Sequence, residues 1–187
     1  MITFIATAYR ETIDTYQFIS CLLLQTNPNW KCIIYCDEPN EYIKKSIEFY
    51  NDDRISYYEN ESPKGWWGHY NRKEALYNLV DTEFVIQTSI QDYYTPNTVD
   101  VLSKHANFYD FIYFDCIHNH FNYEVLISEP KSSRIDWGSF TIRTEIAKAV
   151  GINHVESSIG DGQFVEDCFR RPNLRYIKLN KILTVHN

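Results

Sequence analysis

The stretch QTSIQDYYTP, residues 87–96, follows an apolar run and leads into a helix-like segment. A strand that ends in polar residues and turns into a helix is well placed to hold a ligand. The turn offers one carboxylate, Asp92, beside the amide of Gln91 and the hydroxyl of Ser89. Oxygen ligands of this kind suit Mg²⁺ or Mn²⁺, although two of these three carry no charge. The stretch is therefore either a weakly charged metal site or a turn in which Asp92 has only a local role.

Groups suited to stacking, hydrogen bonding and phosphate binding follow the other predicted strands. A tyrosine can stack on a nucleobase, a carboxylate can accept from a base N–H, and an arginine offers a fork of donors to a diphosphate. Glycine lets the backbone approach a ligand closely. These groups are Thr7, Ala8, Tyr9 and Arg10, then Asp37, then Lys64, Gly65, Trp66, Trp67, Gly68, His69 and Arg72, and finally Asp115 and His118.

Hydrophobic periodicity places these groups at the ends of strands in an alternating α/β chain. Strand-like runs cover 2–6, 32–36, 55–58, 84–87 and 111–114. Helical spacing covers 11–24, about 40–50 with Asn40 as a cap, a segment through Leu79 and a segment with Pro96 in its first turn. Such alternation predicts a mainly parallel, Rossmann-like sheet with helices on both faces. Because ligands bind beyond the carboxyl ends of parallel strands, the polar groups above are expected at one edge.

The pattern changes after residue 116. Residues 117–142 look like extended segments around the loop EPKSSR, and helices follow at about 143–150, ended by Gly151, and at 161–170. Two short strands finish the chain. We therefore predict one domain over residues 1–187, with a ligand-binding part, 1–116, and a small mixed α/β part, 117–187.

Composition excludes several classes of protein. The net charge of −7 argues against nucleic acid as a partner, because phosphate backbones need a basic surface. No apolar run approaches the length of a membrane span, and the first residues are typical of a strand and not of a signal peptide. The five cysteines are odd in number and lack paired metal-ligand spacing, which predicts reduced core thiols in a cytoplasmic protein. Neither Gly-x-Gly-x-x-Gly nor Gly-Lys-Ser/Thr is present, so simple NAD and ATP sites are disfavoured.

Ordered blocks along the chain resemble those of a known family. The blocks are ITFIATAYR, QTNPNWKCIIYCDE, GWWGHYNRKEAL, FVIQTSIQDYYTP, IDWGSFTIR, AKAVG, GDGQFVE and LTVHN. In this order they cover nearly the whole chain and look like the successive blocks of GT-A fold glycosyltransferases, family 2 type. The resemblance implies a GT-A fold and the transfer of a hexose from a nucleotide-sugar, usually a UDP-sugar. It also implies a glycan or lipid-linked sugar as acceptor and inversion of the anomeric centre.

The resemblance assigns a role to individual residues. Asp161 matches the aspartate that deprotonates the acceptor hydroxyl, and Asp136, Trp137 and Gly138 fall where the acceptor site has its floor. The positions expected to bind the nucleotide are Thr7, Ala8, Tyr9, Arg10, Asp37, Trp67, Gly68 and Arg72.

The resemblance further implies a divalent cation, Mn²⁺ or Mg²⁺, held by an Asp-x-Asp motif and a C-terminal histidine. That motif aligns with Ser89-Ile90-Gln91, so both carboxylates are replaced and Asp92 follows directly. We predict a variant site that uses Gln91, Asp92 and His186, with weaker metal dependence than is usual.

Other interpretations stay open at this point. Asp161 could cap the helix that follows it, and Arg72 could be a solvated charge. The missing Asp-x-Asp favours a catalytically silent binder of nucleotide-sugars or glycans. A metal hydrolase is the third hypothesis, because His118 and His120 share a strand face and could bind zinc with Asp115 and His186. A nucleotidyltransferase is disfavoured by the lack of a lysine- and glycine-rich loop after the first strand.

Overall fold

The computed structural model describes residues 1–10 and 14–187. Its strands form one mixed sheet in the order β3-β2-β1-β4-β8-β6-β9-β5, with β7 paired to β6. The strands are β1 (Ile2–Ala8), β2 (Trp30–Cys36), β3 (Ile55–Glu59), β4 (Phe84–Ser89), β5 (Tyr93–Tyr94), β6 (Phe111–His118), β7 (Glu124–Leu126), β8 (Phe140–Arg143) and β9 (Tyr176–His186). The α-helices are α1 (Asp14–Leu23), α2 (Glu41–Tyr50), α3 (His69–Asn78), α4 (Thr98–His105), α5 (Thr144–Val150) and α6 (Gly160–Phe169).

The first half of the chain has the predicted alternation of strands and helices. β1 pairs in parallel with β2 and β4, and β2 pairs in parallel with β3. Asn40 caps α2 as predicted, since its side chain accepts a hydrogen bond from the N–H of Ile43. Pro96 lies just before the N-cap of α4 and not in its first turn. The helix expected from Glu11 begins in residues 11–13, which lie outside the described residues.

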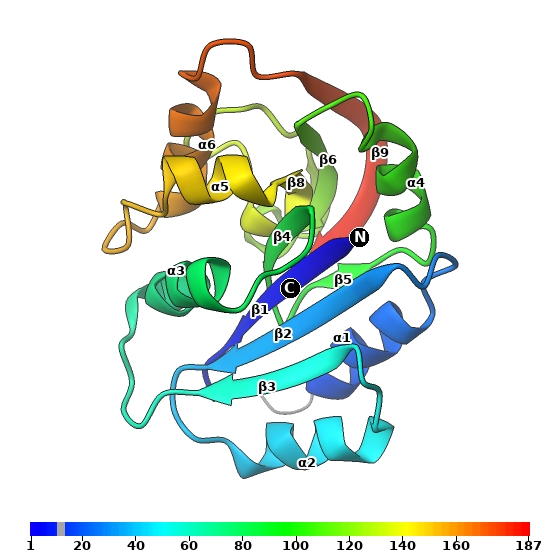
Figure 1. Ribbon diagram of the computed structural model, residues 1–187, viewed down its shortest axis with the longest axis vertical. Coiled ribbons are helices and arrows are strands. Elements are labelled where there is room, and N and C mark those ends of the chain that lie inside the picture. Colours follow the sequence, from blue (N-terminus) through cyan, green and yellow to red (C-terminus); the bar gives the residue numbers. More distant parts are fainter. Residues whose placement is uncertain (11–13) are drawn as a thin grey trace.

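Helices cover both faces of the sheet (Figure 1). Alternate residues of β1 point to opposite faces, so Phe4 packs with α1, α2 and α4 while Ile5 packs with α3, α5 and α6. Each face therefore has its own hydrophobic core, and the predicted two-sided α/β architecture is confirmed. All five cysteines are free thiols, and four of them are buried. Among the described residues, no helix is both long and apolar enough to cross a membrane.

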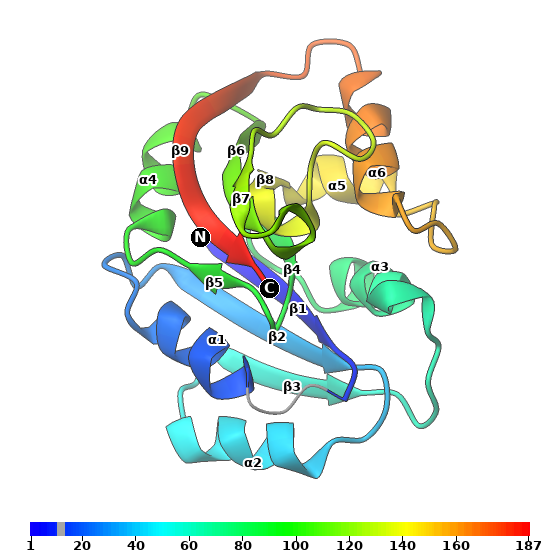
Figure 2. The same cartoon turned by 180° about the vertical axis from the view of Figure 1, so that it is seen from behind.

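The second half of the sheet is mixed. β8 runs antiparallel between β4 and β6, and β5 runs antiparallel to β9. The prediction of two short final strands is wrong, because β9 is one strand of 11 residues that curves around the sheet (Figure 2). Register shifts between Phe114 and Cys116 interrupt its pairing with β6, and this irregularity explains the apparent break in the sequence pattern.

This topology decides which residues meet. β6 and β9 are parallel to each other, and β8 reverses direction between β4 and β6, so β1, β2, β4, β6 and β9 all end at one edge. At that edge the last residues of β6 and β9, His118 and His186, are register partners. Asp92 directly precedes β5, whose first residue pairs with the residue before His186.

Candidate functional site at the carboxyl edge of the sheet

A cleft of about 1070 Å³ opens at the carboxyl edge of the strands. It is lined by every residue to which the resemblance assigned a role except Arg10 and Gly138. Arg10 is exposed and pairs with Glu38 at 3.2 Å. Gly138 lies behind the cleft wall, where an added Cβ would stand 3.0 Å from Oδ2 of Asp92. The structure thus brings residues from the whole chain to one cavity, although their binding roles stay predictions.

Asp37 organises one end of the cleft. Its carboxylate accepts hydrogen bonds from the backbone N–H groups of Lys64 (3.0 Å) and Gly65 (2.8 Å) and from the side-chain amides of Asn71 (3.2 Å) and Asn60 (3.4 Å). Only 3% of Asp37 is exposed. This carboxylate therefore fixes the start of the loop that carries Trp66 and Trp67.

Replacing Asp37 by Asn is expected to destabilise the protein by about 1–3 kcal/mol, because an amide nitrogen would face buried N–H donors. Urea unfolding of Asp37→Asn should give a lower midpoint at an unchanged slope. The exposed Asp53 supplies the matched control variant, Asp53→Asn. Equal midpoints for the wild type and Asp37→Asn would show that the loop does not depend on this carboxylate.

The loop from Gly65 to Gly68 has positive φ angles throughout. Its φ angles are 68°, 54°, 52° and 74°, and the two middle values belong to Trp66 and Trp67. Left-handed conformation costs a residue with a Cβ roughly 1 kcal/mol or more. The two indoles are 45% and 63% exposed, and both line the cleft. The strained loop therefore presents a pair of large aromatic surfaces at the entrance.

Arg72 supplies a buried positive charge to the centre of the cleft. Its guanidinium donates to the carbonyl oxygens of Trp67 (2.5 Å) and Thr88 (2.9 Å). Burial lowers the pKa of Arg72 to about 10, so the group stays protonated at neutral pH. Among the described residues no carboxylate forms an ion pair with it, and its Nε has no partner. The alternative of a solvated charge is wrong, since Arg72 is 5% exposed.

Asp161 stands in the first turn of α6, across the cleft from β4. The helix has Ile159 at its N-cap position, so Asp161 is not the cap. Burial raises the pKa of Asp161 to about 7, and the nearby carboxylate of Asp136 adds to the rise. The side chain accepts a hydrogen bond from the N–H of Gly162 at 2.6 Å. A carboxylate with a pKa near neutrality is suited to accept a proton at physiological pH.

His69 positions the segment that leads to Asp161, and sequence reasoning had named it only as one of several polar residues. The ring is 4% exposed, and burial lowers the pKa of His69 to about 4, so it is neutral. Its Nε2 lies 3.1 Å from the carbonyl oxygen of Ser157, which makes Nε2–H the donor. The ring also packs edge-on against Trp137, with centroids 5.9 Å apart. His69 and Ser157 are 88 residues apart in the chain, so the helical spacing of α3 does not indicate their contact.

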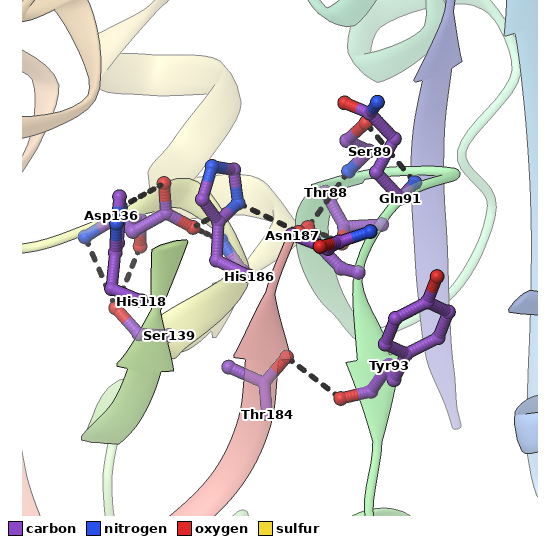
Figure 3. A network of polar contacts seen from close by, with 12 residues as sticks. Thr88, Ser89, Gln91, Tyr93, His118, Asp136, Ser139, Thr184, His186 and Asn187 are labelled. Carbon is purple, nitrogen blue, oxygen red and sulfur yellow. Dashed lines mark hydrogen bonds and ion pairs between the residues drawn. The ribbon is translucent and has the colours of Figure 1, made fainter. Parts of the chain in front are cut away.

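Histidines and carboxylates gather where β4, β6 and β9 end (Figure 3). Nδ1 of His186 lies 2.7 Å from Oδ1 of Asp92 and 3.8 Å from Oδ1 of Asp136. Nε2 of His118 lies 4.0 Å from Oδ2 of Asp136. Burial alone would lower the pKa of His186, but the hydrogen bond to Asp92 and the charge of Asp136 raise it to about 9. Burial and the neighbouring His186 lower the pKa of His118.

Two residues proposed from the sequence as metal ligands lie elsewhere. Asp115 accepts from the backbone N–H of Ser128 at 2.9 Å and pairs with Lys178 at 3.0 Å. Gln91 lines the cleft, but in Figure 3 its side chain lies apart from Asp136 and His186. Because Asp115 is engaged with Ser128 and Lys178, the hydrolase hypothesis loses the carboxylate that it assigned as a metal ligand.

Comparison with known proteins bears on the fold. No protein-family model and no curated protein sequence matches the chain. Among solved structures, S. aureus TarS (residues 1–349) superposes with a TM-score of 0.79 at 14% identity, covering 100% of this chain and 60% of TarS. The same protein in complex with UDP-GlcNAc gives 0.77 at 15% identity, with 98% and 57% covered.

A mannosyltransferase from Pyrobaculum calidifontis, PcManGT, in complex with GDP-Man and Mn²⁺, superposes with a TM-score of 0.78 at 13% identity. That match covers 99% of this chain and 56% of the other. The chain thus spans 56–60% of the length of these proteins. It has the mixed α/β fold of these proteins, and the GT-A fold predicted from the sequence is confirmed.

Proposed function

We propose that the protein is a glycosyltransferase that transfers a hexose from a nucleotide-sugar to a hydroxyl acceptor with inversion of configuration. The observation that carries this proposal is the buried guanidinium of Arg72, which shares one cleft with Asp161 and forms no direct ion pair among the described residues. A buried cation that no carboxylate contacts directly favours an anionic ligand, and a diphosphate provides one. The superposed proteins include complexes with UDP-GlcNAc and GDP-Man, which supports a nucleotide-sugar as the donor.

In the proposed complex the nucleoside occupies the end of the cleft formed by Thr7, Ala8 and Asp37, with uridine as the preferred base. Tyr9, at 44% exposure, is available to stack on the base. Gly68 stands against the side chain of Thr7, where a Cβ would come within 2.8 Å, so a glycine is required for the loop to close over this end. Trp67 and Arg72 then border the diphosphate.

In the proposed reaction Asp161 accepts the proton of the acceptor hydroxyl as its oxygen attacks the anomeric carbon. The bond from that carbon to the diphosphate oxygen breaks, and the nucleoside diphosphate leaves with the bonding electrons. Arg72 stabilises the negative charge that grows on the leaving group. Trp137, buried against His69 and Phe164, forms the floor of the sugar and acceptor end.

A divalent cation fits the site, because imidazole and carboxylate groups meet at the ends of β4, β6 and β9. When bound, such an ion offsets the charge of the diphosphate as a Lewis acid.

The acceptor is proposed to be a glycan or a lipid-linked sugar. Phe121 at 43% exposure and Ile159 at 39% both line the cleft. Exposed apolar groups beside a polar cleft provide stacking surface for sugar rings and contact for an attached lipid.

The proposal is tested by calorimetric titration of UDP into the protein in Mn²⁺ and in EDTA, with GDP alongside. We expect UDP to bind more tightly than GDP, and more tightly in Mn²⁺ than in EDTA. A screen of UDP-sugars against glycan acceptors should then detect released UDP.

Absence of binding by both nucleotides in both conditions would refute the donor site. Binding of the nucleotide-sugar without turnover on any acceptor would instead favour a silent binder, for which the replaced Asp-x-Asp is the supporting observation.

A further inference from the structure

We propose that His118, Asp136 and His186 form a three-ligand site for a divalent transition metal, and that Asp92 positions His186 instead of binding the ion. The site itself rests on the side chains described below, while the use of the ion in sugar transfer rests on the proposed function. This assignment moves Asp136 from the acceptor floor to the metal and replaces the predicted ligands Gln91 and Asp92.

The three side chains are already close enough to share an ion. One ligand atom from each lies within 4.8 Å of the other two. Ligand atoms around an ion at bond lengths of about 2.1 Å stand roughly 3–3.5 Å apart, so the side chains need only a small inward movement. The exposed fractions of the side chains of His118, Asp136 and His186 are 12%, 14% and 21%, and all three residues line the cleft.

Local hydrogen bonds hold one atom of each ligand and direct the other atom inward. Nδ1 of His118 accepts from the N–H of His120 at 3.2 Å, which leaves Nε2 facing Asp136. Oδ1 of Asp136 accepts from the N–H of Gly138 at 2.8 Å, which leaves Oδ2 facing His118. Nδ1 of His186 is held by Asp92 at 2.7 Å, which leaves its Nε2 for an ion. Each ligand is thus oriented by a second contact, as metal-binding histidines usually are.

The backbone enforces this arrangement. His118 and His186 are register partners at the ends of parallel strands, and their ring centroids are 4.4 Å apart. Asp136 is the N-cap of the short helical turn 137–139 that leads into β8, and its side chain participates in a capping box with Ser139. Figure 3 shows the two rings and this carboxylate converging from three different segments.

Asp92 is fully engaged as a support. It is 1% exposed, and its Oδ2 accepts from the hydroxyl of Thr88 and from the N–H of Ser89 (2.9 Å), while Oδ1 holds His186. A carboxylate that orients a histidine in this way also makes the imidazole a stronger ligand.

The carboxylates in the cleft give a further reason for a cation. Those of Asp92, Asp136 and Asp161 lie close enough to Arg72 to act on its charge. Their negative charge would oppose the binding of a diphosphate, and a divalent ion at the site offsets it.

The donor set selects the class of metal. Two imidazoles and one carboxylate suit Mn²⁺, Fe²⁺, Co²⁺ or Zn²⁺, whereas Mg²⁺ and Ca²⁺ prefer oxygen ligands. Three protein ligands also hold an ion without help from a nucleotide, with positions left open for diphosphate oxygens. We therefore expect metal binding to the nucleotide-free protein.

The test uses the full chain, stripped with EDTA and dialysed, titrated with Co²⁺ and Mg²⁺ by calorimetry without nucleotide. Wild type should bind Co²⁺ about 100-fold more tightly than Mg²⁺. His118→Ala and Asp136→Asn should weaken Co²⁺ binding by about 100-fold, and Asp92→Asn by about 10-fold. Asp136→Asn keeps an oxygen to accept from Gly138. His120→Ala is the matched control, because it removes an exposed imidazole from the same turn and should leave affinity unchanged.

A measurement on the wild type alone avoids any folding defect of the variants. Pulsed electron paramagnetic resonance of the Mn²⁺-loaded protein should detect coupling to the nitrogens of two imidazoles. A single nitrogen, equal binding by His118→Ala and wild type, or loss of binding in Gln91→Ala would overturn the site in favour of the turn at 89–92.

UDP titration in EDTA separates this inference from the proposed function. UDP binding by a protein that binds no metal would overturn the metal site and leave the transferase proposal standing. Metal binding by a protein that binds neither UDP nor GDP would keep the site and refute the proposed donor.

Discussion

Asp161→Asn is expected to abolish sugar transfer while making the protein more stable to heat above pH 7. Loss of a positioned general base typically lowers the rate by about 10³-fold. Stability should change in the opposite direction, because the folded state holds this carboxylate in surroundings that raise its pKa from 3.8 to about 7. Between those pH values the folded protein binds a proton that the unfolded chain releases, so folding becomes less favourable as pH rises.

An asparagine at position 161 carries no charge, so it avoids the unfavourable burial of a carboxylate at high pH. Because part of the carboxyl contacts solvent, we expect the Tm of Asp161→Asn to exceed that of wild type by roughly 4–8 °C at pH 8, and by less at pH 5. If the wild-type protein transfers sugar as proposed, its kcat/KM should rise with pH through about 7 as Asp161 loses its proton. Differential scanning fluorimetry at the two pH values and a pH–rate profile check both statements.

Asp167→Asn is the matched control, since it removes a carboxylate from the same helix outside the cleft. Asp167 pairs with His154 at 2.8 Å, so its loss should lower Tm slightly and leave transfer intact. If Asp161→Asn retained activity, or had a lower Tm than wild type at pH 8, Asp161 would be a structural residue of α6.

The predictable part of the fold is the part set by local patterns. Apolar runs and helical spacing predict the longer strands and the helices of residues 1–116, but not the short strand β5. Asn40 is identified as a cap because capping depends on residues three apart in the chain. β9 was divided in two because its pairing with β6 shifts register, and such a shift arises from non-local packing. The insertion of β8 between β4 and β6 is likewise a long-range pairing that periodicity does not encode.

The candidate site is likewise only partly predictable from the sequence. Ordered blocks placed Asp161, Arg72 and His186 at one edge, since parallel strands end together. What each side chain does there depends on partners far away in the chain. The resemblance placed Asp92 and His186 at one site as two metal ligands, but not in contact with each other across 94 residues. The contact of His69 with Ser157 across 88 residues had no sequence signal. The register between β6 and β9 is what the sequence does not show. In that register His118, at the end of β6, pairs with His186 and so joins the cluster.

Arg72→Met is expected to weaken UDP binding by about 100-fold or more while changing the affinity for uridine little. Hydrogen bonds from a guanidinium to phosphate contribute roughly 1.5–3 kcal/mol each, and Nε of Arg72 has no partner among the described residues. Uridine lacks the diphosphate, so it tests the nucleoside end of the cleft alone. Calorimetry with UDP and ligand-observed NMR with uridine separate the two effects.

The stability of Arg72→Met should fall far less than its affinity for UDP. The substitution removes the hydrogen bonds to the carbonyl oxygens of Trp67 and Thr88, but it also removes a charge whose burial is unfavourable. Lys73→Met is the matched control, since it deletes a neighbouring positive charge on α3 that does not line the cleft and should leave UDP binding unchanged.

Arg72→Lys distinguishes geometry from charge. A lysine keeps the positive charge but cannot donate to both carbonyls and to a phosphate in one plane, so UDP affinity should lie between those of wild type and Arg72→Met. If uridine and UDP lost affinity equally in Arg72→Met, the guanidinium would act by holding the Trp66–Trp67 loop. An unchanged affinity for UDP in Arg72→Met would mean that Arg72 stabilises the three neighbouring carboxylates and does not bind the diphosphate.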